Sequence, residues 1–254
     1  YRQSDIPEIP ELCWLLTCVT GKGLLNRAHA YKAAVDKNNA SGSEPDDGVT
    51  AGLFMYPVLM GADILIFNAN KVPVGRDQVQ HLEMARDMAS SFNHIYGSEY
   101  FTLPEAVVEE SVATLPGLDG RKMSKSYNNG IFLSDRMADI QEKVRGMFTD
   151  QARLRKSDPG NPDVCNLFPY HVLLSSPEEQ ADIRKGCTGA TLGCVDCKKI
   201  FLKNLETFLT PLQERRSVLD ANPARVDEIL AHGNERARAF ASQTMALVRE
   251  KMGL

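Results

Sequence analysis

The sequence lacks an apolar run of the roughly 20 residues that a helix needs to span a bilayer, and it shows no charged segment followed by an apolar leader. We therefore expect a cytoplasmic location and no membrane partner. Positive charge is also limited, since 29 lysines and arginines face 33 aspartates and glutamates, a net charge of -4. A nucleic-acid partner would have to bind a local basic patch, for which residues 153–156, 184–185, 198–199 and 215–216 are candidates.

No internal repeat or low-complexity tract appears in the 254 residues. With 43% apolar residues, the chain has enough material for one large core or two smaller ones.

One short polar stretch is suited to phosphate chemistry. Residues 121–126 read Arg-Lys-Met-Ser-Lys-Ser, and glycine-rich polar segments flank them, so we expect a loop. Lys122 and Lys125 are compact charges on flexible stems that can follow the moving charge of a triphosphate, and the hydroxyls of Ser124 and Ser126 can bond phosphate oxygens. The plain alternative is a solvated basic turn or a kinase target.

A second stretch, residues 56–67, is an apolar run interrupted by a single carboxylate, Asp63. An unpaired buried carboxylate costs several kcal/mol, so Asp63 should have a partner. That partner is either a positively charged side chain or a group that arrives with a substrate. Because indole has one N–H donor and no acceptor, a tryptophan site needs one acceptor at the end of an apolar slot, and Asp63 beside Met60 fits this need.

A third stretch, residues 72–83, predicts a short strand that runs into a helix, with Asp77 near the helix cap. Together the three stretches resemble the tryptophanyl-tRNA synthetases, a family of class I aminoacyl-tRNA synthetases. The resemblance extends from Gln3 to the C-terminus and is strongest over residues 56–83 and 121–126. Lys-Met-Ser-Lys-Ser resembles the second signature of that class, the mobile loop that closes on ATP.

The resemblance implies roles for individual residues. Asp63 would accept the indole N–H, Met60, Val72 and Val74 would line the ring pocket, and Tyr56 and Gln78 would hold the polar end of the amino acid. ATP, with Mg²⁺, would meet Gly75, Asp77, Lys122, Met123, Ser124, Lys125 and Ser126, of which Lys122, Ser124 and Lys125 are the expected catalytic residues. Many family members have Glu where this sequence has Arg76, so no role is carried over to that position. The related tyrosine enzyme would need a phenol-OH partner in place of Met60 and Asp63.

The first signature of the class, His-x-Gly-His or His-x-Gly-Asn, does not occur in the sequence. The residues from Tyr1 onward resemble the third strand of the family rather than its first, so we expect the sequence to be the back two thirds of a longer protein. Without the front portion, half of the ATP site would be missing and tryptophan activation would be slow.

Four of the six cysteines are clustered, at Cys165, Cys187, Cys194 and Cys197. The last two form a C-x-x-C at the expected start of a helix, where two thiolates can bind one centre. In a cytosolic protein such clustering favours a metal centre over disulfides. Cys13 and Cys18 lie in an apolar helical stretch and are expected to be buried thiols.

The spacing alone distinguishes zinc from iron–sulfur poorly, since both accept four thiolates. The four positions resemble those of a subset of bacterial tryptophanyl-tRNA synthetases that carry a [4Fe-4S] cluster in the helical domain. The resemblance therefore favours a structural [4Fe-4S] cluster, with zinc second.

The apolar periodicity predicts helices and one buried strand, hence an α/β fold. The resemblance implies a partial Rossmann-like class I catalytic domain (1–134) followed by an all-helical, tRNA anticodon-binding domain (135–254). A buried parallel strand is expected at 62–67 and a loop at 36–50. Helices are expected at 9–19, 24–35, 52–60, 77–96, 138–147, 177–184 and 194–219, with two more between 223 and 252.

The predicted function, for the complete protein, is that of a tryptophan–tRNA ligase, with tryptophan, ATP and tRNA(Trp) as partners and a homodimer implied by the resemblance. One alternative is a nucleotidyl transferase that activates another acid. Another is a synthetase-derived, non-catalytic module that binds tRNA or protein through helices bearing an iron–sulfur cluster.

Overall fold

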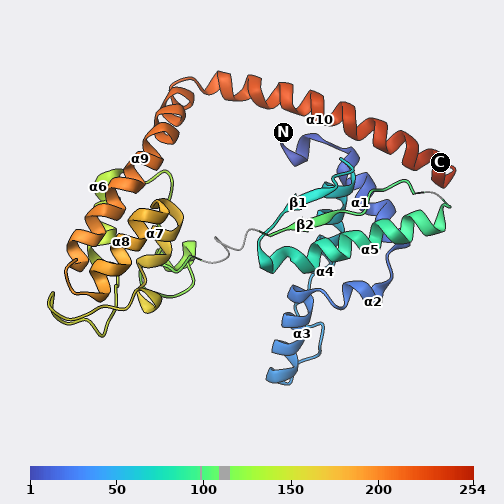
Figure 1. The fold of residues 1–254 in the computed structure, drawn as a ribbon. Helices are drawn as coiled ribbons and strands as arrows, with labels where there is room; N and C mark the ends of the chain where they lie inside the picture. Colours follow the sequence, from blue (N-terminus) through green and yellow to red (C-terminus); the bar gives the residue numbers. More distant parts are fainter. Residues whose placement is uncertain (98, 109–114) are drawn as a thin grey trace. The chain divides into compact units, whose positions relative to one another are not determined.

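The computed structural model describes residues 1–97, 99–108 and 115–254 (Figure 1). The chain packs as two compact units: unit 1 is Tyr1–Glu109 with Ala224–Leu254, and unit 2 is Glu110–Pro223. This division differs from the predicted boundary at 134/135, because the lysine–serine loop packs with the helices that follow it and the last helix packs with the N-terminal unit. The functional roles assigned to 1–134 and 135–254 stay predictions.

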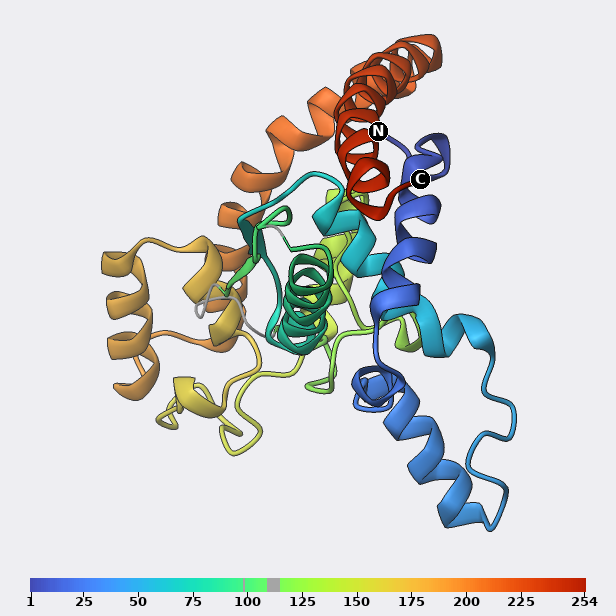
Figure 2. The same ribbon diagram turned by 90° about the vertical axis from the view of Figure 1, so that its right-hand side faces the viewer.

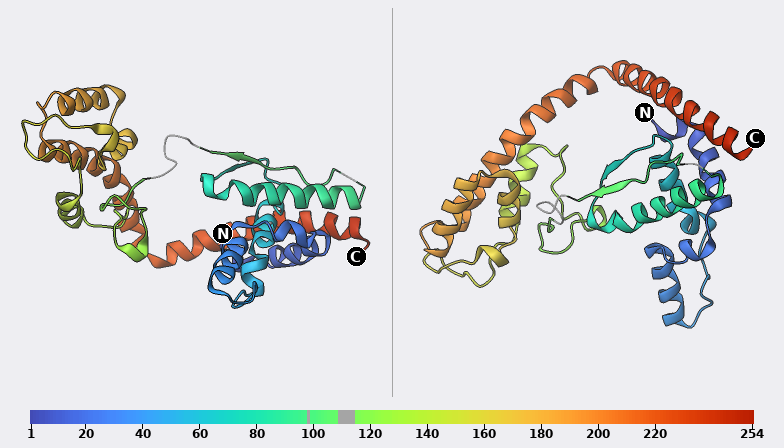
Figure 3. Two further views of the ribbon diagram at one scale, coloured as in Figure 1. Left: turned by 90° about the horizontal axis from the view of Figure 1, so that it is seen from below. Right: turned by 45° about the vertical axis from the view of Figure 1, so that its right-hand side comes forward.

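Unit 1 contains a two-stranded parallel sheet, in which β1 (Lys71–Pro73) lies beside β2 (Glu105–Val107) with Val72 opposite Ala106. Parallel neighbours need a crossover connection, which α5 (Val79–Ile95) supplies, running along the strands in Figure 3. The other helices of unit 1 are α1 (Glu8–Val19), α2 (Lys22–Leu25), α3 (His29–Ser41), α4 (Ala51–Leu65) and α10 (Pro223–Met252), with 3₁₀ turns η1 (Gln3–Asp5) and η2 (Arg76–Gln78).

The core of unit 1 is shared by α1, α4, α5 and α10. In Figure 2, α10 (red) runs alongside α1 (blue). Arg249 of α10 forms two hydrogen-bonded contacts with the Glu11 carboxylate, at 2.7 and 2.5 Å, and Ser242 donates to Glu8 at 2.6 Å. Helix α10 therefore contributes to the core of unit 1.

Unit 2 is helical, with α6 (Met137–Gly146), α7 (Phe168–Leu174), α8 (Pro177–Thr188), α9 (Cys194–Asp220) and the 3₁₀ turns η4 (Lys125–Tyr127) and η5 (Pro162–Val164). Its core is formed by α6, α7 and α9, with Phe201 fully buried at the centre. In the described residues, helices predominate and one small parallel sheet is present, which confirms a partial Rossmann-like unit followed by a helical part. No helix in the described ranges is both long and apolar enough to cross a bilayer.

Several predicted elements are wrong. The strand expected at 62–67 does not form, because α4 continues through Leu65 and the apolar run is the buried end of that helix. The helix expected at 24–35 is two helices, separated by an extended residue at Ala28. The two helices expected between 223 and 252 are one continuous helix, α10, whose buried residues begin only at Ala237. The loop expected at 36–50 begins only after Ser41, where Gly42 adopts a left-handed φ of 74°.

Candidate active site and cysteine cluster

Three predicted tryptophan-site residues lie on α4. Tyr56, Met60 and Asp63 are four and three residues apart, so they share one face of the helix. The Tyr56 hydroxyl lies 2.6 Å from Nε2 of His81, a buried residue of α5. Burial raises the pKa of Tyr56 and lowers that of His81, so both side chains are neutral at pH 7. His81 was not among the predicted site residues, and its bond to Tyr56 is evident only in the structure.

Asp63 has a partner that the sequence did not predict. Both of its carboxylate oxygens accept from Nε2 of Gln3, each at 2.7 Å. The partner within the chain is therefore a neutral amide and not the cation, while a group that arrives with a substrate stays a prediction. Burial raises the pKa of Asp63, and the Gln3 hydrogen bond opposes that rise. A carboxylate has about four lone-pair sites, so the Gln3 contact leaves room for a further N–H donor.

The residues predicted to line the ring pocket meet in part. Met60 and Val72 pack against one small cluster made of Ile64, Leu82 and Ala85. Val74 is half-buried, and its backbone N–H donates to Val107 at 3.0 Å, which ties it to the sheet. Met60 and Val72 therefore contact the same cluster, and Val74 directly follows β1, the strand that contains Val72.

Three residues with predicted roles follow β1, in or next to the η2 turn: Gly75 and Asp77, expected to bind ATP, and Gln78, expected to hold the polar end of the amino acid. Gln78 donates to the Asp77 carboxylate at 3.0 Å, and the side chain of Asp77 folds back over Gly75. Asp77 lies next to the N-cap position of α5, which residue 78 occupies, so it lies near the cap as predicted. These residues belong to unit 1, whereas the lysine–serine loop belongs to unit 2.

The signature loop (residues 121–126) is held at its base by backbone contacts of residues 116–118 with residues 122 and 129, which we call the stem. An isolated antiparallel bridge pairs Pro116 with Lys122, and the Leu118 N–H donates to the Asn129 carbonyl at 2.7 Å. Lys122 and Lys125 are exposed and Ser124 is half-buried, while Met123 packs against the core of unit 2. The side chain of Ser126 lies outside the described part of the chain. The loop thus buries its methionine in unit 2 and exposes its two lysines.

Arg121 and Asp119 strengthen the stem. The Arg121 guanidinium contacts Asp119 Oδ2 at 2.6 Å and lies 4.9 Å from the ring of Tyr127. A hydrogen bond from Asn129 and the Arg121 contacts lower the pKa of Asp119 to about 2. Asp119 is therefore charged throughout the range in which the enzyme would work.

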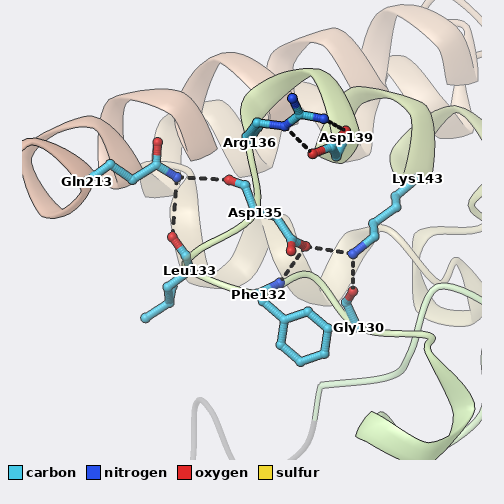
Figure 4. Close-up of polar contacts among 8 residues, drawn as sticks. All are labelled: Gly130, Phe132, Leu133, Asp135, Arg136, Asp139, Lys143 and Gln213. Atoms are coloured by element: carbon cyan, nitrogen blue, oxygen red, sulfur yellow. Dashed lines mark hydrogen bonds and ion pairs between the residues drawn. The ribbon is translucent and has the colours of Figure 1, made fainter. Parts of the chain in front are cut away.

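The segment after the loop is anchored to α6 and α9 (Figure 4). Lys143 Nζ lies 2.6 Å from Asp135 Oδ2 and 3.2 Å from the Gly130 carbonyl, and both charged side chains are half-buried or better. Gln213 of α9 donates to the carbonyls of Leu133 and Asp135 at 3.2 and 3.0 Å. The segment that follows the signature loop is thus held to α6 and α9 by side-chain hydrogen bonds.

The four clustered cysteines converge in unit 2. Nη1 of Arg153 lies 3.9 Å from the sulfurs of both Cys187 and Cys194. Burial, together with the neighbouring Cys165, Cys187 and Cys194, raises the pKa of Cys197 to about 12. Cys194 and Cys197 lie in the first turn of α9, as predicted. The prediction that Cys13 and Cys18 are both buried is wrong for Cys18, which is exposed.

The arrangement is not that of a single-ion site. Within the described ranges, no three or more His, Cys, Asp or Glu side chains are placed to hold one metal ion. Sequence reasoning placed Arg153 in a candidate basic patch and not beside the cysteines, and it missed the buried His171, whose Nε2 lies 3.3 Å from the Cys197 sulfur. Nothing in the spacing of these two residues marked them as neighbours of the cysteines.

Comparisons with known proteins agree with this geometry. Residues 1–210 match the family described as class I tRNA synthetases (W and Y). Tryptophan–tRNA ligases of Bordetella parapertussis and Xanthomonas campestris pv. campestris are 54% and 51% identical over 255 residues, which cover the whole of this chain. The chain spans 56% and 58% of the length of these two relatives.

Solved structures give the same result. The tryptophanyl-tRNA synthetase of Campylobacter jejuni, complexed with ADP and tryptophan, superposes with a TM-score of 0.80 at 38% identity, over 99% of this chain and 76% of that one. The enzyme of Mycoplasma pneumoniae superposes with a TM-score of 0.76 at 27% identity, over 99% and 75% of the two chains. The chain therefore belongs to the tryptophanyl-tRNA synthetases, within the class I tRNA synthetases.

Proposed function

We propose that the complete protein activates tryptophan with ATP and transfers it to tRNA(Trp). The observation that carries this proposal is the signature loop, with both lysines exposed on a stem anchored at either end. The α4 face supports it, because Asp63 is a half-buried acceptor on the same helix face as an apolar Met60.

The proposed chemistry has two steps. The tryptophan carboxylate attacks the α-phosphate of ATP in line and displaces pyrophosphate, and the terminal hydroxyl of the tRNA then takes the acyl group from the adenylate. Lys122 and Lys125 would meet the charge that develops on pyrophosphate, and Ser124 would bond a phosphate oxygen. Magnesium would enter with ATP and shield its phosphates. None of these residues needs to be a covalent nucleophile.

Within unit 1, Asp63 would accept the indole N–H while Gln3 holds its rotamer, and Met60, Val72 and Val74 would contact the ring. Tyr56 and Gln78 would hold the amino acid's polar end, with Gly75 and Asp77 on the adenylate side. The test is tryptophan-dependent exchange of pyrophosphate into ATP by the complete enzyme. Exchange with another acid instead would favour the nucleotidyl transferase reading, and tRNA binding without any exchange would favour a non-catalytic module.

We also propose a tRNA-contact surface on unit 2. A groove of about 520 Å³ lies between α6 and α9, with Met137, Val144 and Leu202 on its apolar side. Four cations and one carboxylate line it, namely Arg145, Lys198, Lys199, Lys203 and Glu206. Lys198 is held in place, because its ammonium donates to the carbonyls of Arg145 and Met147 at the end of α6. This surplus of positive charge over an apolar floor suits a nucleotide strand, with phosphates on the cations and bases on the floor.

Reversing charge in this groove should weaken tRNA binding. We expect Arg145→Glu with Lys203→Glu to lower tRNA affinity roughly 10- to 100-fold near 0.1 M salt and to flatten its salt dependence, because fewer counterions are released. Filter binding over a salt series measures both effects. Charge reversal at Arg236 and Lys251, exposed on α10, is the matched control. If the groove variant and the control lose affinity equally, the tRNA surface lies elsewhere.

We propose further that Cys165, Cys187, Cys194 and Cys197 hold a structural [4Fe-4S] cluster, with zinc as the second choice. Burial raises the pKa values of Cys165, Cys187 and Cys197, and neighbouring cysteines of the four contribute to each rise, which supports their proximity. A tetrahedral zinc ion with Zn–S bonds of about 2.3 Å would need its sulfurs within roughly 4 Å of one another.

Protein purified without oxygen should be brown, with broad absorption near about 400 nm. Cys194→Ser should bleach it and loosen α9, while Cys18→Ser, which alters an exposed thiol of unit 1, should leave the colour unchanged. Because Met123 of the signature loop packs on the same core of unit 2 as Cys165 and Cys197, loss of the cluster should slow adenylate formation as well as tRNA charging. Colourless protein with one stoichiometric zinc would overturn the iron assignment and keep the ligands, and folded metal-free protein under reducing conditions would overturn both.

A homodimer, implied by the resemblance, is likewise a proposal. Sedimentation equilibrium of the complete enzyme tests it, and a monomer at micromolar concentration would contradict it.

A further inference from the structure

Asn129 is almost fully buried, with 4% of its surface exposed, although it lies in a polar loop. Its side chain makes three hydrogen bonds across the base of the signature loop. Nδ2 donates to Asp119 Oδ1 at 2.8 Å and to the Lys122 carbonyl at 3.1 Å, and Oδ1 accepts from the Ser124 N–H at 2.8 Å. The amide thereby joins the stem to the backbone on either side of Met123.

The stem is shaped around this amide. A Cβ atom at residue 117 would lie 2.2 Å from Nδ2 of Asn129, so Gly117 is needed for the close approach. Asp119, which accepts from Asn129, is itself fixed by Arg121 at 2.6 Å. Few alternative positions for the amide are therefore open.

We propose that Asn129 is a positioning residue, which holds the backbone of Lys122 and Ser124 in one arrangement so that both lysines reach the nucleotide together. The proposal rests on the proposed ATP chemistry of the loop. Asn129 itself is buried beneath the loop and reaches the phosphates only through the backbone that it holds. Because the three bonds join the loop to its own stem, the loop should close on ATP as a preformed unit.

The structural part of this proposal is tested by amide hydrogen exchange over residues 121–127 in the complete enzyme. Asn129→Ala removes the acceptor of the Ser124 N–H, so exchange at that amide should become roughly tenfold faster or more. The control is Asn128→Gly, a neighbouring exposed residue with a left-handed φ of 48° that glycine also adopts. Unchanged exchange at Ser124 in the alanine variant would overturn the proposal.

The functional part is tested by pyrophosphate exchange. Asn129→Ala should lower kcat roughly 10- to 100-fold and leave the KM for tryptophan unchanged, because the error in position affects only the phosphate side. Equal changes in kcat and in the KM for tryptophan would indicate a general structural role. Faster hydrogen exchange with an unchanged kcat would overturn the positioning role.

A double substitution at residues 119 and 129 tests whether the lost reaction rate can be restored. Asn129→Asp places a second carboxylate against Asp119 and should be worse than alanine, whereas adding Asp119→Asn restores a donor–acceptor pair and should recover several-fold of the lost rate. No recovery in the folded double variant would overturn the Asp119–Asn129 link. If the wild-type enzyme shows no tryptophan-dependent pyrophosphate exchange, the proposed function is wrong. The amide hydrogen exchange of the variants still tests the Asn129 contacts in that case.

Discussion

Lys125→Ala should slow adenylate formation by roughly 100-fold or more, while tryptophan binding stays nearly intact. The Lys125 side chain is exposed at the tip of the signature loop, so its removal leaves no cavity. A lysine that meets charge developing on the leaving pyrophosphate acts mainly in the transition state, and its loss therefore appears in the rate. Single-turnover adenylate formation, with tryptophan affinity measured in parallel, gives both numbers.

The matched control for that experiment is Lys185→Ala, which removes an exposed lysine of α8 in the same unit. It should leave the rate of adenylate formation unchanged, since no tRNA takes part in this step. If Lys125→Ala lowers tryptophan affinity as much as it lowers the rate, the lysine supports the structure of the site and the transition-state role is wrong.

Asp63→Ala should cost roughly 2–4 kcal/mol in kcat/KM for tryptophan, or about 30- to 1000-fold, since a charge-assisted hydrogen bond to the indole N–H is lost. Discrimination against tyrosine and phenylalanine should fall with it. Steady-state pyrophosphate exchange with each amino acid measures both effects. A variant that keeps its kcat/KM within a factor of about three would contradict the assignment.

Two further variants separate the role of Asp63 from its contact with Gln3. Asp36→Ala removes an exposed carboxylate of α3 and should have no effect. Gln3→Ala keeps the acceptor but frees its rotamer, so the loss should be smaller than for Asp63→Ala. Because burial raises the pKa of Asp63, kcat/KM for tryptophan should also begin to fall on acidification at a higher pH than for an ordinary aspartate.

Local chemistry made much of the fold predictable. The strand–turn–helix at residues 71–95 and the start of α9 at Cys194 follow from polarity, periodicity and cap position. The strand expected at 62–67 failed because a short, wholly apolar run fits both a buried strand and the buried end of a helix. Only the length of α4, set by its packing on α5, decides between them.

The candidate site was likewise predictable only in part. The signature loop was evident because its residue types are unusual together, and the structure confirms it as a polar loop. The side chains that hold the site in place were missed, because Gln3 and Asp63 are 60 residues apart, and His81 and Tyr56 are 25 apart. Asn129 is only five residues from Ser124, yet an asparagine beside a glycine is typical of any turn, so nothing in the sequence marked it as buried.

The packing of α10 against α1 has a consequence for synthesis on the ribosome. Ala241, Met245 and Val248 complete the core that Ile9 and Leu12 begin, so unit 1 is assembled from both ends of the sequence. Unit 2 is one continuous stretch, and all of it is made before α10. Unit 2 can therefore reach its native packing while the chain is still being elongated, whereas unit 1 must wait with an open apolar face until α10 leaves the exit tunnel.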